Sequence, residues 1–274
     1  NHRSIQEYYN ASMFEMEVLD FLGSFFANHD QVVMTGGSGM YIDAVCRGID
    51  DIPTVDPEIR SRVRREYETT GLEGIRLRLK HVDPEYYLKV DLKNPVRIMK
   101  ALEIAEMTGK PYTTFLTGRS KERDFATIKI GLDLPRQELH ERINRRVDIM
   151  MDRGLLEEAR SLYSHKHLNA LNTVGYKELF GYFDGKYSLD EAIEMIKGHT
   201  RQYARRQLTW FRRDKEMKWF RPDENESIFD YLLHPDGVGV PRRGVCTLRN
   251  ENDLVKDSTQ IHRHSLKDTF YIGK

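Results

Sequence analysis

The chain has 274 residues, enough to bury a sizeable core and to hold one large domain or two medium ones. Its 43 lysines and arginines balance 43 aspartates and glutamates, so affinity for nucleic acid would have to come from a local cluster of charge. The only two cysteines, Cys46 and Cys246, exclude a disulfide scaffold and favour a reducing compartment, so we expect a cytoplasmic protein. No apolar run reaches the roughly 20 residues of a membrane span, and no membrane partner is expected.

The first part of the chain, residues 1–52, is predicted to be α/β. Apolar residues recur at helical spacing between Tyr9 and Asn28, and the β-branched run 32–35 predicts a strand. Gly36-Gly37-Ser38-Gly39 then predicts a tight turn into a helix that ends at Gly48. Such a turn can bring backbone close to an anion at the helix N-terminus, with Ser38 placed near a phosphate or a reacting base. Packing alone, with the serine as N-cap, explains the pattern as well.

Residues 53–118 are predicted to form a helical insertion that contains no strand. Asp56-Pro57, Asp83-Pro84 and Asn94-Pro95 each place a capping side chain before a proline, which is a helix start signal. We expect helices over 58–69, 71–81 and 96–107, with another beginning at Asp83-Pro84 and the last one ending at Gly109.

The chain then returns to α/β in residues 119–233. A strand is predicted for 126–134 and a helix for 136–152, with an apolar stripe that includes Ile143 and Val147. Arg146 falls at the edge of this stripe, which suggests either a side chain that snorkels to solvent or one held as an anion ligand.

Ser188 to Glu191 is a capping box that starts a long helix running to about Arg213. Its first half is apolar, whereas its second half is cationic and aromatic. Arg201, Arg205 and Arg212 share one stripe, and Tyr203, Arg206, Trp210 and Arg213 share the next. Because like charges this dense repel each other, we favour a nucleic-acid backbone lying across them over a merely solvated face. For Trp210, a place in the core is favoured over a base-stacking role.

Beyond His234 the periodicity fails, and residues 234–274 are expected to be a tail that is disordered or forms poorly packed coil. The histidine pairs at 165 and 167 and at 262 and 264 have no carboxylate or cysteine partners at ligand spacing, so no metal site is predicted from them.

Taken together, the motifs resemble those of the tRNA dimethylallyltransferases, also called tRNA isopentenyltransferases or the IPP transferase family. The match runs in the family's order from about Ile5 to His234. It rests on residues 35–41, 48–53, 56–60, 82–84, 94–103, 142–154, 174–178 and 205–212. The most specific motifs are the turn Gly36-Gly37-Ser38-Gly39-Met40-Tyr41, the segment Val174-Gly175-Tyr176-Lys177-Glu178 and the segment Arg205-Arg206-Gln207-Leu208-Thr209-Trp210-Phe211-Arg212.

The resemblance implies a partial P-loop nucleotide-kinase-like core with parallel strands, plus a helical insertion that binds tRNA. The implied reaction transfers a dimethylallyl group from dimethylallyl diphosphate, with Mg²⁺, to N6 of an adenosine adjacent to the anticodon. It implies catalytic roles for Ser38 and Arg146. The implied tRNA contacts are Ser38, Arg60, Val96, Arg97, Ile98, Met99, Lys100, Asn172, Thr173, Val174, Gly175, Tyr176, Lys177, Arg205, Arg206, Gln207, Leu208, Thr209, Trp210, Phe211 and Arg212. We expect a monomer.

The sequence departs from the family's pattern in two segments. The family's phosphate-binding loop, with its Lys-Thr/Ser, and the Asp-Ser segment that supplies the general base normally precede the point at which this chain starts. We therefore expect the chain to be an incomplete fragment, inactive alone, that lacks the main Mg²⁺-binding segment. Two other hypotheses stay open: a non-catalytic RNA-binding module that acts through the helix after Ser188, and a relative of the P-loop small-molecule kinases. The kinase reading requires a Walker lysine, which is not found here.

Overall fold

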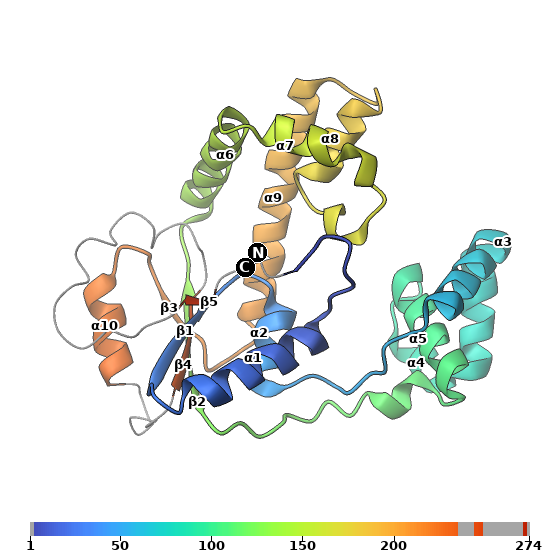
Figure 1. The fold of residues 1–274 in the computed structure, drawn as a ribbon, viewed down its shortest axis with the longest axis horizontal. Helices are drawn as coiled ribbons and strands as arrows, with labels where there is room; N and C mark the ends of the chain where they lie inside the picture. The colour runs from blue at the N-terminus through green and yellow to red at the C-terminus, as the bar shows by residue number, and fades with distance from the viewer. Residues whose placement is uncertain (1–2, 235–243, 249–270, 273–274) are drawn as a thin grey trace. The chain divides into compact units, whose positions relative to one another are not determined.

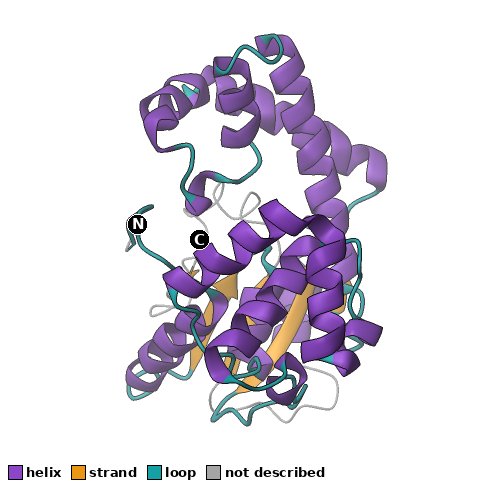
Figure 2. Ribbon diagram, turned by 90° about the vertical axis from the view of Figure 1, so that its right-hand side faces the viewer, coloured by secondary structure: helices purple, strands orange, loops and turns teal. Residues whose placement is uncertain are grey.

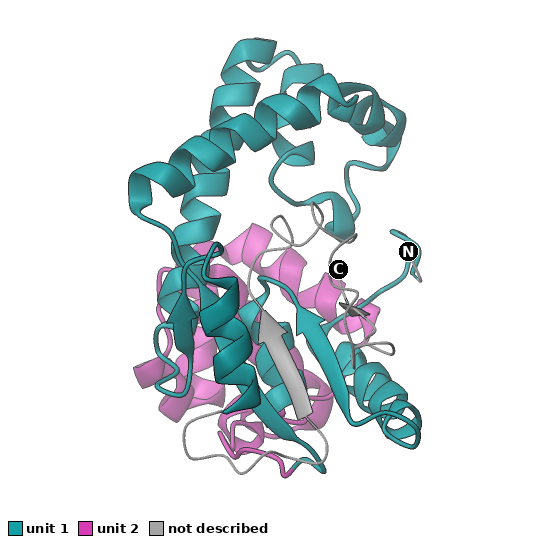
Figure 3. Ribbon diagram, turned by 90° about the vertical axis from the view of Figure 1, so that its left-hand side faces the viewer, with its two compact units in different colours: residues 1–46, 123–274 teal, residues 47–122 magenta. Residues whose placement is uncertain are grey.

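The computed structural model describes residues 3–234, 244–248 and 271–272. Two compact units make up the chain (Figure 3): residues 1–46 together with 123–274, and residues 47–122. The second unit begins and ends slightly outside the predicted 53–118, because the two connecting stretches bind each other. The backbone N–H of Lys121 donates to the carbonyl oxygen of Arg47 at 2.7 Å, and that of Thr117 donates to the Asp50 carboxylate at 2.9 Å.

The larger unit contains a parallel sheet, as the sequence predicted (Figures 1 and 2). Its described strands are β1 (Gln31–Thr35), β2 (Ala126–Leu132), β3 (Lys218–Phe220), β4 (Gly244–Leu248) and β5 (Tyr271–Ile272). Their order is β3-β2-β4-β1-β5, and each pairing is parallel.

The expectation of a wholly disordered tail is wrong for β4 and β5. β4 pairs along the full length of β1 and also with β2. An unpaired strand edge exposes backbone N–H and C=O groups that need partners, and the short run Gly244–Leu248 supplies them. That strand is too short to give a periodic signal in the sequence. The rest of the tail, including His262 and His264, lies outside the described residues.

Side chains of β1 alternate between two faces of the sheet. Val32 and Met34 are buried with α1 (Ala11–Phe25), α2 (Gly39–Arg47) and Phe211. Val33 instead packs with the cluster that α10 (Asn225–Leu233) covers (Figure 1). This two-residue alternation is what a strand between two layers requires.

A buried ion pair ties α1 to the end of α2. The guanidinium of Arg123, three residues before β2, bonds the Glu15 carboxylate at 2.7 Å and the carbonyl oxygens of Ala44 and Val45 at 2.8 Å. These two carbonyls belong to the last turn of α2, where intrahelical donors are lacking. The network therefore positions the helix that follows the glycine turn.

A helical layer forms the remainder of the larger unit. Its elements are α6 (Arg136–Asp152), α7 (Leu155–Leu162), η2 (Tyr163–His165), η3 (Asn169–Leu171), α8 (Tyr176–Phe183) and α9 (Leu189–Phe211). They share one apolar cluster that includes Val147 of α6 and Ile196 of α9. The capping box at Ser188 is present as predicted, with the Glu191 N–H donating to the Ser188 hydroxyl at 3.2 Å.

The unit 47–122 is helical throughout, as predicted. It comprises α3 (Pro57–Val82), α4 (Pro84–Lys89), α5 (Pro95–Thr108) and η1 (Tyr112–Phe115). Gly71 breaks α3 with φ of 68°, which reproduces the two helices expected from the sequence. Asp83 caps α4 and also bonds the backbone N–H of Thr113 at 2.8 Å, so η1 is held against the helices. Ile75, Leu79, Ile98 and Leu102 form the centre of its core.

Candidate active site and tRNA-binding surface

Helix α9 lies directly against the glycine turn between β1 and α2. The side-chain amide of Gln207 donates to the carbonyl oxygen of Gly37 at 2.8 Å, and the Trp210 indole N–H donates to the Asp43 carboxylate at 2.9 Å. A Cβ at Gly39 would lie 2.2 Å from the Trp210 ring, and one at Gly37 would lie 1.8 Å from the Gln207 amide nitrogen. Neither glycine has positive φ, so close approach is what requires them. These glycines therefore serve packing, the plainer of the two sequence hypotheses.

Ser38 lies between these two glycines, is half-buried, and directly precedes α2. The structure thus brings Ser38 beside Gln207 and Trp210, three of the residues that the resemblance groups at the tRNA. The sequence alone could not pair them, because Gln207 is 170 positions from Gly37.

Trp210 is not a core residue, contrary to the sequence-based preference. Its side chain is 36% exposed, and the Arg213 guanidinium lies 4.1 Å from the ring centroid. Gly39 packs against the indole ring and the Arg213 guanidinium lies over it, so little of the ring surface is available for stacking on a base. The neighbouring Phe211 is buried in the core instead and cannot present its side chain to RNA.

The motif Val174 to Glu178 forms the start of α8. The Gly175 N–H donates to the buried Glu178 carboxylate at 2.7 Å, and the His199 imidazole of α9 is bonded to the same carboxylate at 2.6 Å. Gly175 has φ of 106°, a conformation that favours glycine. This part of the motif therefore joins α8 to α9. Burial, with the hydrogen bond to Glu158, raises the pKa of Tyr176 to about 12, so its phenol stays neutral at physiological pH.

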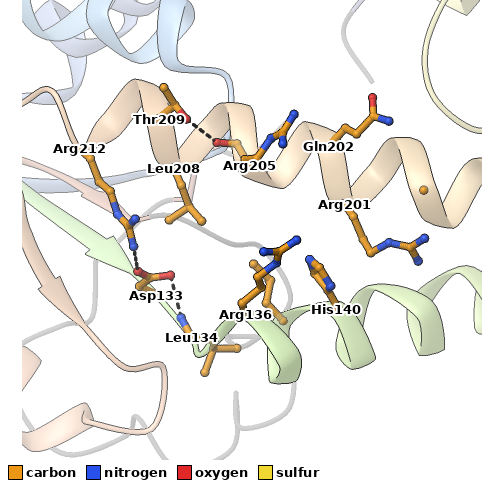
Figure 4. A pocket seen from close by; sticks show the side chains of 12 residues that line it. Asp133, Leu134, Arg136, His140, Arg201, Gln202, Arg205, Leu208, Thr209 and Arg212 are labelled. Atoms are coloured by element: carbon orange, nitrogen blue, oxygen red, sulfur yellow. Dashed lines mark hydrogen bonds and ion pairs between the residues drawn. The ribbon is translucent and has the colours of Figure 1, made fainter.

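A pocket of about 550 Å³ lies between α6 and α9 (Figure 4). Four arginines and one aspartate line it, together with neutral and apolar side chains. The lining residues are Asp133, Leu134, Arg136, Leu139, His140, Gly198, Arg201, Gln202, Arg205, Leu208, Thr209 and Arg212. Arg201, Arg205 and Arg212, the predicted cationic stripe, all line this pocket.

The single acid of the pocket is already paired. Arg212 bonds the Asp133 carboxylate at 2.6 Å (Figure 4). Arg201 bonds the side-chain oxygen of Asn144 at 2.6 Å. The pocket thus carries an excess of positive charge. Sequence reasoning missed Asp133, Arg136 and His140. The signal for them was the position of Asp133 directly after a strand, and the spacing of four that places Arg136 and His140 on one face of α6.

Arg146 is exposed on α6 and forms no ion pair or side-chain hydrogen bond with another residue in the part of the chain that the structure describes. Its side chain is therefore available to an anion. It does not line the pocket between α6 and α9.

In the helical unit, the residues expected to contact tRNA differ in how exposed their side chains are and in their contacts with other residues. Arg60 forms an ion pair with Glu103 at 3.8 Å, and burial raises the pKa of this carboxyl while Arg60 lowers it. Val96 and Arg97 are exposed at the start of α5, whereas Ile98 is fully buried in the core and cannot contact RNA through its side chain. Met99 and Lys100 are half-buried.

The described residues do not gather three or more histidine, cysteine, aspartate or glutamate side chains at any point where they could hold a metal. We therefore assign no ligand of this chain to Mg²⁺ and derive no step through it. Within the same part of the chain, no helix combines the length and apolarity that crossing a membrane requires.

Comparison with known proteins places these features in a family. The family model described as IPP transferase matches residues 1–214. The chain is 56% identical to tRNA dimethylallyltransferase 1 of Bacteroides fragilis over 228 residues, which cover 83% of this chain and 76% of that protein. It is 51% identical to the tRNA dimethylallyltransferase of Christiangramia forsetii, over 84% of this chain and 77% of that protein.

Solved structures agree with this fold. The full-length tRNA isopentenylpyrophosphate transferase of Bacillus halodurans matches with a TM-score of 0.50 and 29% identity, over 83% of this chain and 73% of that one. A eukaryotic dimethylallyltransferase acting on tRNA matches in fold with a TM-score of 0.68 and 23% identity, over 85% of this chain and 63% of that one. The fold is therefore that of an α/β transferase core. The chain belongs to the IPP transferase family.

Proposed function

We propose that this chain serves in tRNA modification, the transfer of a dimethylallyl group from dimethylallyl diphosphate to N6 of an adenosine adjacent to the anticodon, in the cytoplasm. The observation that carries the proposal is its 56% identity to a tRNA dimethylallyltransferase over 83% of the chain. The cationic half of α9, with Arg201, Arg205 and Arg212 on one pocket wall, supports RNA as the substrate.

The chemistry accounts for the residue types present. Adenine N6 is a poor nucleophile because its lone pair is delocalised into the ring. In the transfer, a bond forms from N6 to the allylic carbon while the bond from that carbon to the diphosphate oxygen breaks. One N6 proton leaves to a base, which we assign to no residue of this chain. The departing diphosphate gains charge, and a preorganised cation stabilises it.

Arg146 is the residue we propose for that stabilisation. Its exposed guanidinium has no competing carboxylate among the described residues, so it is ready to meet an incoming anion. Ser38, which adjoins the contacts of α9 with Gly37 and Gly39, is proposed to bind the target base through its hydroxyl. Mg²⁺, when bound, would neutralise diphosphate charge.

A target adenine must leave its stack to be reached, at a cost of a few kcal/mol that contacts to the flipped base and its backbone offset. We propose that the exposed residues among 172–177 and 205–212, with Arg60, Val96, Arg97 and Lys100, supply contacts to tRNA. Ile98 and Phe211 are not included, because both side chains are buried.

The proposal is tested with a fusion that carries a family phosphate-loop segment ahead of Asn1. The fusion is incubated with unmodified tRNA, dimethylallyl diphosphate and Mg²⁺, and the tRNA is digested and analysed by mass spectrometry. We expect one dimethylallyl group on an adenosine beside the anticodon. Binding of tRNA without any transfer would favour a non-catalytic RNA-binding module and contradict the proposal.

A further inference from the structure

The pocket between α6 and α9 contains cationic groups that no other side chain of the described residues neutralises. Arg136 and His140 extend from α6 towards α9, and Arg201 and Leu208 extend from α9 towards α6 (Figure 4). Within the described part of the chain, the Arg136, His140 and Arg205 side chains take part in no ion pair and no hydrogen bond. Opposed cations without counter-charges are electrostatically unfavourable, and a bound anion removes that cost.

The backbone at the same place also favours an anion. Arg136 is the first residue of α6, a helix of 17 residues, and Pro135 at its N-cap offers no side-chain hydrogen bond to the first turn. The first N–H groups of a helix have no intrahelical acceptors and carry the positive end of the helix dipole. Phosphate oxygens at this position would accept from these N–H groups and from the arginine side chains together.

We propose, on the basis of the proposed function, that this pocket binds a backbone phosphate of the tRNA substrate, with Arg136 and His140 as contacts besides Arg205. The residues of α6 extend the RNA surface beyond the α9 helix. Arg212 also has a structural part, because its bond to Asp133 compensates the only carboxylate that lines the pocket and ties the end of α9 to the residue after β2.

An RNA chain fits better than a small free anion because positive charge continues beyond the pocket. Arg206 of α9 and Arg213, two residues beyond the end of that helix, are exposed and do not line the pocket. Gln202 and Thr209 on the pocket wall add neutral groups that can bond a ribose or a second phosphate. A polymer with a charge at each nucleotide can use the whole of this surface at once, whereas a single diphosphate cannot.

The test measures binding of a fluorescein-labelled anticodon stem-loop RNA to the 274-residue protein by anisotropy at several salt concentrations. Arg136→Gln should weaken binding about tenfold and lower the slope of log affinity against log salt by roughly 0.7 to 0.9. Arg136→Lys, which keeps the charge, should retain the slope. Arg145→Gln is the matched control, because Arg145 is an exposed arginine of the same helix that does not line the pocket. It should bind RNA like the parent.

Equal effects of Arg136→Gln and Arg145→Gln, or no effect of either, would overturn the site. Inorganic diphosphate, titrated into the same proteins by calorimetry, separates the two possible sources of phosphate. If Arg136→Gln lost diphosphate binding but kept the parent's RNA affinity, the assignment to RNA would be wrong. If the parent protein bound no RNA, both this inference and the proposed function would be wrong. If the parent bound RNA but Arg136→Gln bound it equally tightly, only this inference would be wrong.

Discussion

The side-chain amide of Gln207 bonds the carbonyl oxygen of Gly37, and this contact joins the long helix α9 to the turn that holds Ser38. Together with the bond from Trp210 to Asp43, it couples the cationic helix to the α/β core. A change in α9 should therefore alter the turn, even where the substituted residue touches no substrate.

Alanine substitutions in the turn should differ sharply in their effect on stability. Gly39→Ala places a Cβ against the rigid Trp210 ring, and we expect a loss of about 1–3 kcal/mol in the free energy of unfolding. Gly37→Ala should cost less, since the Gln207 amide can swing aside. Gly36→Ala is the control, because a Cβ there meets nothing within 4 Å. Urea denaturation of the three variants checks this order, and equal stability of Gly36→Ala and Gly39→Ala would contradict it.

The buried pair of Glu15 and Arg123 should be important for stability. Glu15→Ala leaves the Arg123 guanidinium without its carboxylate in a buried position, for which we expect a loss of roughly 3–5 kcal/mol. The same change at Glu85, whose ion pair with Lys89 is exposed, should cost about 0–1 kcal/mol. Chemical denaturation followed by circular dichroism compares the two. Similar losses for both variants would show that the Glu15 contact contributes no more than a surface pair.

Glu103 should make stability depend on pH in the acidic range. Burial raises the pKa of its carboxyl above the ordinary value, although Arg60 and Lys100 lower it. The folded state therefore binds this proton more tightly than the unfolded state. The stability that this bound proton provides is fully present below the pKa of Glu103 in the unfolded state. It is lost as the pH rises through the pKa of Glu103 in the folded state. Glu103→Gln should match the parent near pH 4 and gain relative to it near pH 7, as measured by thermal melts. A relative loss at pH 7 would mean that the ion pair with Arg60 outweighs the burial.

Local signals in the sequence were enough to predict most of the helices. Pro135 and Gly154 bracket α6, whose observed bounds are the predicted ones, and Gly109 ends α5 in the left-handed conformation. The partners of the glycine turn could not be predicted, because Gly37 and Gln207 meet only after the whole chain has folded. The same reason explains the error at Trp210: an aromatic residue beside Phe211 has the spacing of a core residue, and only the packing shows which ring is buried.

In the proposed tRNA-binding surface of α9, the charge of each arginine could be predicted from the sequence but its partner could not. Arg212 is bound to Asp133, whereas the Arg205 guanidinium has no protein partner among the described residues. In salt-titrated tRNA binding, Arg205→Ala should therefore lower the slope of log affinity against log salt by roughly 0.7 to 0.9. Arg212→Ala should change the slope less, since this charge is already compensated. A larger change in slope for Arg212→Ala than for Arg205→Ala would show that the ion pair between Arg212 and Asp133 opens when RNA binds.

The proposed role of Arg146 is tested by the rate of prenyl transfer in the fusion that carries a phosphate-loop segment, compared between Arg146→Ala and Arg145→Ala. Both arginines are exposed on α6, so both variants should fold like the parent. We expect Arg146→Ala to lower the single-turnover rate on the order of 100-fold or more, as loss of one preorganised donor to developing charge does, and Arg145→Ala to keep the parental rate. A parental rate for Arg146→Ala would contradict the claim that this side chain stabilises the departing diphosphate.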